Sequence, residues 1–179
     1  IALGETILST GLAIAGNLED PLIFLTGTVS LAGSVAIWWC YFHGLEQDIL
    51  EKLDSVDDQF RPGILAGNTL VVLLAGLILV AVGDQLVISD PAARPDLATV
   101  LLLFGGPALF LAGRGFFIRQ VLGQRQPSDL VGIGALVVLA TLSFLLPAFV
   151  AAMGAVLPLV GVAVSDAVNR RRRTQQGAR

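Results

Sequence analysis

A single acidic residue, Glu5, interrupts the apolar segment at the start of the sequence. It precedes Asn17, where that segment ends, by about 18 Å of helix, which places it near the centre of a hydrocarbon core of about 30 Å. A carboxyl group at that depth must be protonated, paired or in contact with water. Two roles stay open: a proton or cation site that hydrogen-bonds with Thr6 and Ser9, or a structural hydrogen bond between helices.

Two further polar residues lie in apolar segments. Asn68 follows a spacing of small residues at 63–67 that allows helices to approach closely, so we expect it to hydrogen-bond between helices or to line the same pathway as Glu5. Arg114 lies near the end of its apolar segment. Its long side chain either reaches the lipid headgroups as an anchor or pairs with Glu5.

Other reactive residue types occur singly. His43 and Cys40 are each the only residue of their kind, so no zinc site and no disulfide is expected. Gly105 and Gly106 lack the lysine and the strand-to-helix context of a phosphate-binding loop. Because neither paired acids nor a nucleophile with a base are visible, we expect no enzyme activity, no metal and no cofactor.

The composition argues against a water-soluble globule. Hydrophobic residues make up 55% of the 179 residues and charged residues 14%, with a mean hydropathy of +0.81, against about 45–50% and about 25% in soluble domains. The net charge of −3, with the basic residues in separate clusters, argues against a nucleic-acid partner. We therefore expect an all-α polytopic transmembrane helix bundle whose partner is the lipid bilayer.

Five or six segments are long enough for a crossing, which needs about 20 apolar helical residues. Residues 129–168 are too long for one crossing, and Pro147, which removes a helical hydrogen-bond donor, divides them. The pattern predicts one transmembrane domain, 1–169, and a basic cytoplasmic tail, 170–179. The expected spans are about 1–16, 22–43, 63–83, 97–118, 129–146 and 148–168.

Lysine and arginine set the expected orientation, because cationic loops stay on the cytoplasmic side. Placing the tail 170–179 inside puts all the basic residues on that side except Arg94, in the loop 84–96. We therefore expect the protein in the cytoplasmic membrane with its C-terminus in the cytoplasm.

The expected cytoplasmic loop, 44–62, is acidic and has apolar residues at three- and four-residue spacing from Leu45 to Val56. This pattern is typical of an amphipathic helix. Two interpretations stay open: a solvated helix at the cytoplasmic surface, or an acidic helix that binds a cation or docks a partner.

A weak internal echo links residues 2–8 (ALGETIL) with residues 81–87 (AVGDQLV) at an offset of 79. Transporters carry such repeats, with their sites at the repeat interface. The different depths of Glu5, mid-bilayer, and Asp84, at a helix end, argue against a repeat, so a true repeat and a chance match both stay open.

Several motifs together resemble the bacterial low temperature requirement A family. They are IALGETIL at 1–8, WWCYF at 38–42 and VAVGDQLVISDP at 80–91, followed by GGPALFLAG at 105–113. The resemblance implies a larger multi-pass membrane protein, with further helices, and an acidic Phe-Phe-Asp motif, N-terminal to this chain. The family name records a requirement for growth in the cold, and the resemblance supplies no activity.

Two positions depart from the family pattern: His43 stands where an acid is usual, and residues 57–64 replace a stretch that contains tyrosine and histidine. No role is carried over to these positions.

These observations favour a transporter or channel for a proton, a cation or a small solute, with Glu5, Thr6, Ser9 and Asn68 on the pathway. The alternatives are a non-catalytic membrane protein for structure or stress adaptation and, third, a membrane-embedded enzyme. Because the sequence opens within an apolar helix, we also expect the C-terminal part of a larger bundle. A homo-oligomer is a further expected assembly.

Overall fold

The computed structural model describes residues 2–16, 19–53, 60–123 and 126–177. Within these ranges, the side chains of 43–66, 121–122 and 169–177 lie outside the described part, as do several near the N-terminus, including those of Glu5, Thr6 and Ser9. The described residues form six helices and no strand: α1 (Ala2–Ala15), α2 (Pro21–Leu53), α3 (Phe60–Ser89), α4 (Leu97–Leu122), α5 (Pro127–Ser143) and α6 (Ala148–Gly177).

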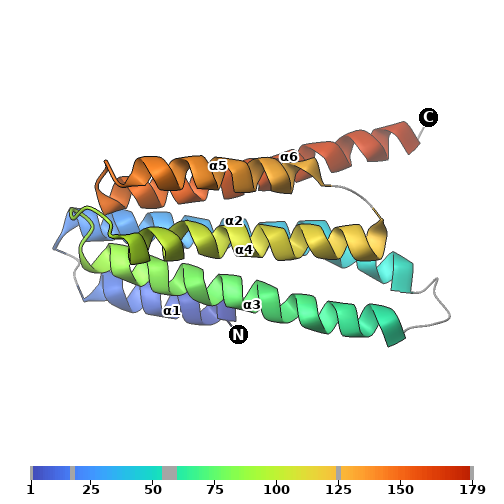
Figure 1. Cartoon of the computed structure of the whole chain (residues 1–179), viewed down its shortest axis with the longest axis horizontal. Coiled ribbons are helices and arrows are strands. Elements are labelled where there is room, and N and C mark those ends of the chain that lie inside the picture. Colours follow the sequence, from blue (N-terminus) through green and yellow to red (C-terminus); the bar gives the residue numbers. More distant parts are fainter. Residues whose placement is uncertain (1, 17–18, 54–59, 124–125, 178–179) are drawn as a thin grey trace.

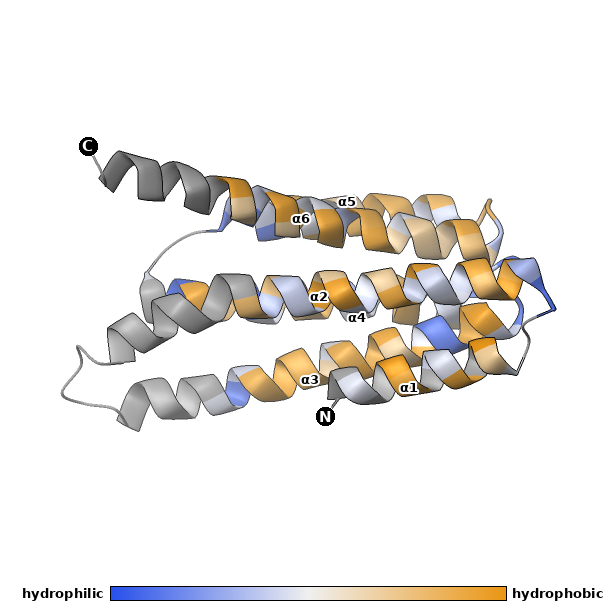
Figure 2. Cartoon of the chain, turned by 180° about the vertical axis from the view of Figure 1, so that it is seen from behind, coloured by the Kyte–Doolittle hydropathy of each residue, from blue (hydrophilic) through white to orange (hydrophobic). Residues whose placement is uncertain are grey.

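Most of these helices are suited to lipid. Four stretches are long and apolar enough to cross a membrane, and α5 is a shorter apolar helix; the four are Pro21–Phe42, Gly67–Ser89, Leu97–Gln120 and Ala148–Val168. Large apolar side chains such as Val71, Leu101 and Leu130 stay exposed on the outer faces, and hydrophobic residues follow the helices along their length (Figure 2). Such a surface fits lipid chains better than water. The protein is a multi-pass membrane protein built as an all-α bundle, as its sequence predicts.

Local signals set several helix ends. Asp20 accepts a hydrogen bond from the backbone N–H of Leu22 at 2.8 Å and caps the start of α2. Asp96 does the same for α4 by accepting the N–H of Thr99 at 2.8 Å. Gly123, with φ +64°, ends α4 in the left-handed conformation that glycine adopts without strain.

Two helices continue past their apolar stretches. α2 runs to Leu53, so the expected acidic loop is, up to that residue, a continuation of a membrane-spanning helix rather than a separate surface helix. Residues 54–59 lie outside the described residues. α6 likewise continues through the basic tail to Gly177. Glutamate, glutamine, lysine and arginine are good helix formers and neither segment contains proline, so nothing ends these helices at the apolar boundary.

The six helices stack in three layers: α5 with α6, α2 with α4, and α1 with α3 (Figure 1). The most extensive contact joins α3 and α4. A Cβ on Gly106 would lie 2.7 Å from the backbone nitrogen of Val80, and one on Gly83 would lie 2.9 Å from that of Leu103. These glycines let the two backbones approach each other, as small residues do in membrane bundles.

Residues 129–168 form two helices, as expected from the proline between them. α5 ends at Ser143, and α6 begins at Ala148, directly after Pro147. The N–H of Ala148 donates to the carbonyl of Ala93 at 2.8 Å. The α5–α6 turn is therefore fastened to the α3–α4 loop, and both lie at one end of the bundle, opposite the α4–α5 loop (Figure 1).

Candidate functional site

The predicted pathway residues Glu5, Thr6 and Ser9 lie on α1, which packs against α2 and α3. α1 begins beside the middle of the bundle's length (Figure 1). The three side chains lie outside the described part of the structure, so their roles stay predictions. Thr10, the next residue along the helix, is 4% exposed, so α1 does direct a polar group into the bundle.

Asn68 is exposed near the start of the apolar stretch of α3, whereas its neighbour Thr69 is buried. Asn68 therefore turns away from the interior that the described residues form. This position does not support a hydrogen bond from Asn68 to another helix, and it does not support a place for Asn68 on a pathway. Both roles stay predictions.

Arg114 turns into the bundle. It is 1% exposed and is the largest of the fully buried side chains that the structure describes. An arginine that anchors a helix extends its charge into the headgroup region, so the anchor interpretation is wrong. The described partners of the guanidinium come from α5 and α6, and the alternative partner, Glu5, has no described side chain.

Two carboxylates bind this guanidinium, and one hydroxyl binds one of the two carboxylates. Arg114 Nη1 donates to Asp129 Oδ1 at 2.8 Å, and Nη2 donates to Asp166 Oδ2. Ser128 Oγ donates to the other oxygen of Asp166, Oδ1, at 3.1 Å. We call these four residues the arginine cluster. Because its members come from α4, the first turn of α5 and α6, the cluster joins three helices.

The arginine cluster is not fully satisfied. Arg114 Nε and Asp129 Oδ2 are buried and have no hydrogen-bond partner among the described residues. A Cβ on Gly115 would lie 3.2 Å from Asp129 Oδ2, so the glycine leaves room for this carboxylate. With every charge ionised, one guanidinium faces two carboxylates, and the cluster carries one net negative charge in a buried place.

A third buried acid, Asp84, lies on α3 near the other end of the bundle. It is 6% exposed and lines a cavity of about 20 Å³ with Ser30 of α2 and with apolar residues of α4 and α6. The ion pairs found among the described residues both belong to Arg114, so none of them neutralises Asp84. We call Asp84, Ser30 and this cavity the Asp84 site.

The Asp84 site offers unused hydrogen-bonding capacity. Ser30 is 1% exposed, and its Oγ lies near the Asp84 carboxyl group but makes no hydrogen bond of normal length and angle within the described part of the chain. Pro107 has no N–H with which to bond the carbonyl of Leu103, four residues earlier, and both residues line the cavity. A cavity needs roughly 10–15 Å³ to hold one water. The site is therefore polar and large enough for a single water molecule.

The sequence does not predict three of the site residues, Asp84, Asp129 and Asp166. Asp84 enters only as part of the internal echo, of the motif at 80–91 and of the expected loop 84–96, whereas α3 continues past it to Ser89. Asp129 and Asp166 fall inside expected spans without attracting notice. The signal is present nonetheless, because an ionisable residue inside an apolar span is a functional or paired group by default. A buried arginine in particular requires acids nearby.

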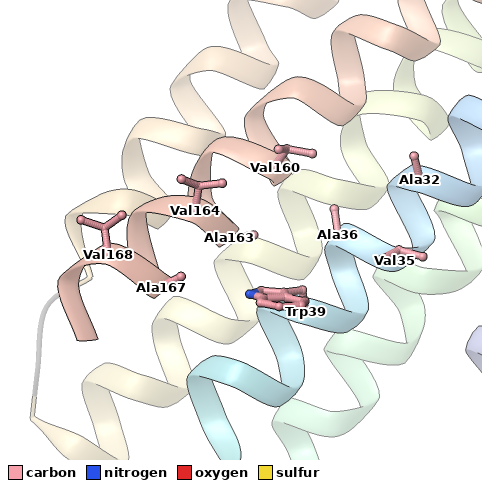
Figure 3. A pocket seen from close by; sticks show the side chains of 9 residues that line it. All are labelled: Ala32, Val35, Ala36, Trp39, Val160, Ala163, Val164, Ala167 and Val168. Carbon is pink, nitrogen blue, oxygen red and sulfur yellow. The ribbon is translucent and has the colours of Figure 1, made fainter. Parts of the chain in front are cut away.

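An open apolar groove of about 410 Å³ lies between α2 and α6 (Figure 3). Its walls carry alanine and valine side chains from both helices together with the ring of Trp39. No charged side chain lines it, so it offers apolar contact rather than chemistry. The candidate functional sites are the Asp84 site and the arginine cluster.

Comparison with known proteins places the chain in a family. Residues 1–164 match the family described as "Bacterial low temperature requirement A protein (LtrA)". The chain is 34% identical over 167 residues to "Uncharacterized protein RA0937" of Rhizobium meliloti (strain 1021), a match that covers 90% of this chain and 39% of that protein. The chain thus spans about two fifths of that relative's length. No solved structure matches it. The chain belongs to the bacterial low temperature requirement A family.

Proposed function

We propose that this protein moves a proton or a small monovalent cation across the membrane, as part of a transporter or channel, and that Asp84 binds the ion on its way. The observation that carries the proposal is the Asp84 site. Its carboxyl group is buried without a described counter-charge, beside an unpartnered hydroxyl, on a cavity that can hold one water.

The physical argument concerns the cost of the charge. An ionised carboxylate without a partner in an apolar interior is strongly unfavourable. A bound proton removes that charge, and a small cation that keeps one water compensates it. Because no fixed guanidinium or ammonium group of the described residues occupies this position, the compensating charge can be a mobile one.

Glu5, with Thr6 and Ser9, is proposed as a second, deeper station on the same route. What supports this is the position of α1, which packs against α2 and α3, the helices that carry Ser30 and Asp84. Asn68 is proposed to contribute near the other end of α3.

A structural role is the second candidate, and a specific observation favours it. The arginine cluster joins α4, α5 and α6 and so makes the bundle rigid. A protein that stabilises or adapts the membrane needs such a rigid bundle. A membrane-embedded enzyme is the third candidate, and no specific observation on the described residues favours it.

The proposed orientation places the C-terminus in the cytoplasm. Arg94 lies in the α3–α4 loop, at the end of the bundle opposite the C-terminal end of α6 (Figure 1). An impermeant thiol reagent should label Arg94→Cys from outside and Gln175→Cys from inside, in a Cys40→Ala background. Labelling of both from the same side would contradict the proposed topology.

Flux measurements test the proposed function. The protein is reconstituted in liposomes that contain a pH-sensitive dye, and a pH gradient, a sodium gradient or a potassium gradient is applied in turn. Asp84→Asn keeps the shape of the side chain but cannot bind a proton or carry a charge. We expect it to reduce flux at least tenfold, or by about 1.4 kcal/mol in barrier.

Asp90→Asn is the matched control, because Asp90 is an exposed acid just beyond the end of the same helix. It should leave flux unchanged. Wild-type flux in an Asp84→Asn protein with native circular dichroism and native elution would overturn the proposal, as would the absence of any ion flux through the unmodified protein.

A further inference from the structure

The arginine cluster contains one acid more than it has bases. Arg114, Asp129 and Asp166 are 1%, 2% and 8% exposed, so water does not screen the excess. Burial of an uncompensated charge costs several kcal/mol even after relaxation. A positive charge in addition to that of Arg114 must therefore neutralise the excess negative charge of the cluster in the folded protein.

One carboxylate oxygen of the cluster is left without a hydrogen-bond partner among the described residues. Both oxygens of Asp166 are engaged, Oδ2 by Arg114 and Oδ1 by Ser128. Asp129 uses only Oδ1, and its buried Oδ2, which is directed at the space above Gly115, has no hydrogen-bond partner among the described residues. Among the described carboxylate oxygens of the cluster, Asp129 Oδ2 is therefore the one left free to bind the neutralising species.

The chemistry of this position selects a proton over a metal ion. Calcium takes 6–8 oxygen ligands and magnesium requires a near-octahedral shell, whereas Asp129 offers one free oxygen. The guanidinium of Arg114, 2.8 Å from the other oxygen of the same carboxyl group, would also repel a metal cation. A proton needs a single oxygen and no shell.

We propose that the arginine cluster is a proton-binding site, in which Asp129 Oδ2 takes one proton and thereby makes a neutral buried joint between α4, α5 and α6. One O–H bond forms at Oδ2 while one O–H bond of a solvent hydronium ion breaks and leaves water. Asp129 Oδ1 continues to accept from Arg114, and Arg114 with Asp166 remains an ion pair. The proton comes from the solvent beside the α4–α5 loop, because Asp129 lies in the first turn of α5.

The described groups that face Asp129 are few. α4 contributes Arg114, and α6 contributes Asp166. α2 contributes Cys40, a buried thiol that donates to the carbonyl of Leu159 at 3.8 Å. On α5 itself, the Ser128 hydroxyl binds Asp166. Of these, the cation is permanently charged and already paired, so the extra proton resides on the acids.

Infrared spectroscopy of the protein in lipid tests this inference, since a protonated carboxyl group has a C=O stretch separate from that of a carboxylate. The parent is Glu5→Gln/Asp84→Asn, which removes from the spectrum the other acid that is buried among the described residues and the acid that the sequence places inside the bilayer. At neutral pH, Asp129→Asn in this parent should lose the band of one carboxyl equivalent. Asp166→Asn should lose it as well, because Asp129 then becomes the ionised partner of Arg114.

The control Asp90→Asn should leave the band unchanged. A measurement without cluster variants supports the same conclusion: the band should vanish as pH rises, and thermal stability should fall over the same range, because the folded state binds a proton that the unfolded state releases. Retention of the full parental band in either folded variant would overturn the inference, as would a band whose loss leaves stability unchanged. Neither result bears on ion flux through the Asp84 site.

Discussion

The Asp84 site and the arginine cluster are both buried, and both border α4, yet they treat buried charge in opposite ways. Gly83, beside Asp84, faces Leu103 of α4, and Arg114 lies roughly 16 Å further along that helix. In the arginine cluster, fixed side chains from three helices pair with one another. In the Asp84 site, a carboxyl group and a hydroxyl group share a cavity.

Because of this difference, we expect one region to stabilise the bundle and the other to bind and release an ion. Charged groups that pair across helices hold those helices together, and removing one of them leaves the others unpaired. Groups that lack fixed partners contribute little to holding the bundle, but they can take up and release a ligand. We therefore expect substitutions in the arginine cluster to affect folding first, and substitutions in the Asp84 site to affect flux first.

The largest effect is expected for Arg114→Gln, which leaves Asp129 and Asp166 without a cation. The free energy of unfolding should fall by about 3–5 kcal/mol, as measured by unfolding in detergent. The loss should be smaller in acid, where both carboxyl groups can be protonated. The exposed Arg119 provides the control Arg119→Gln, which should change it by less than about 0.5 kcal/mol. Equal losses of stability in the two variants would show that the arginine cluster does not stabilise the fold.

A smaller effect is expected for Gly106→Ala. The added Cβ would lie 2.7 Å from the backbone nitrogen of Val80, which lines the Asp84 cavity. Overpacking of this kind costs about 1–3 kcal/mol. Gly105→Ala is the neighbouring control, because a Cβ there meets nothing within 4 Å, and it should be neutral or stabilise the helix by up to about 1 kcal/mol. A stable, active Gly106→Ala protein would show that the close α3–α4 contact does not shape the site.

Ser30→Ala should have a still smaller effect on stability, below about 1 kcal/mol, because the hydroxyl bonds no described group whose pairing would be lost. Ion flux should fall, because the cavity loses one of its polar walls. Unfolding and flux are measured on the same preparation, with the exposed residue Thr28 as the control in Thr28→Ala. A large loss of stability with unchanged flux would reverse the roles assigned to the two regions.

The smallest effect is expected at the α4 N-terminus, outside both regions. Hydrogen bonds from the side chain and backbone of Thr99 lower the pKa of Asp96 below its usual range. The ionised cap therefore stabilises the fold above that range, and this contribution is lost as pH falls through the lowered pKa. Asp96→Asn keeps an acceptor but does not titrate, so its melting temperature should drop less on acidification. Identical acid sensitivity of both proteins would contradict this assignment.

The sequence predicts the helices well, because continuous apolar runs and Pro147 carry that information locally. The continuation of α2 to Leu53 is not predicted, since a polar helix-forming segment leaves no mark at the membrane boundary. The arginine cluster is not predicted either. Arg114, Asp129 and Asp166 meet only because α4, α5 and α6 take particular rotations, and helices that are apolar on all sides have no hydrophobic face to reveal them.

The most direct test of this division is proton flux through Asp84→Asn and Asp129→Asn in matched liposomes. Both variants replace a buried acid by its uncharged isostere, and Asp129→Asn imitates the protonated cluster. We predict that Asp84→Asn loses flux at least tenfold, about 1.4 kcal/mol in barrier, while Asp129→Asn retains the flux of the unmodified protein. Loss of flux in folded Asp129→Asn with normal flux in folded Asp84→Asn would contradict the account.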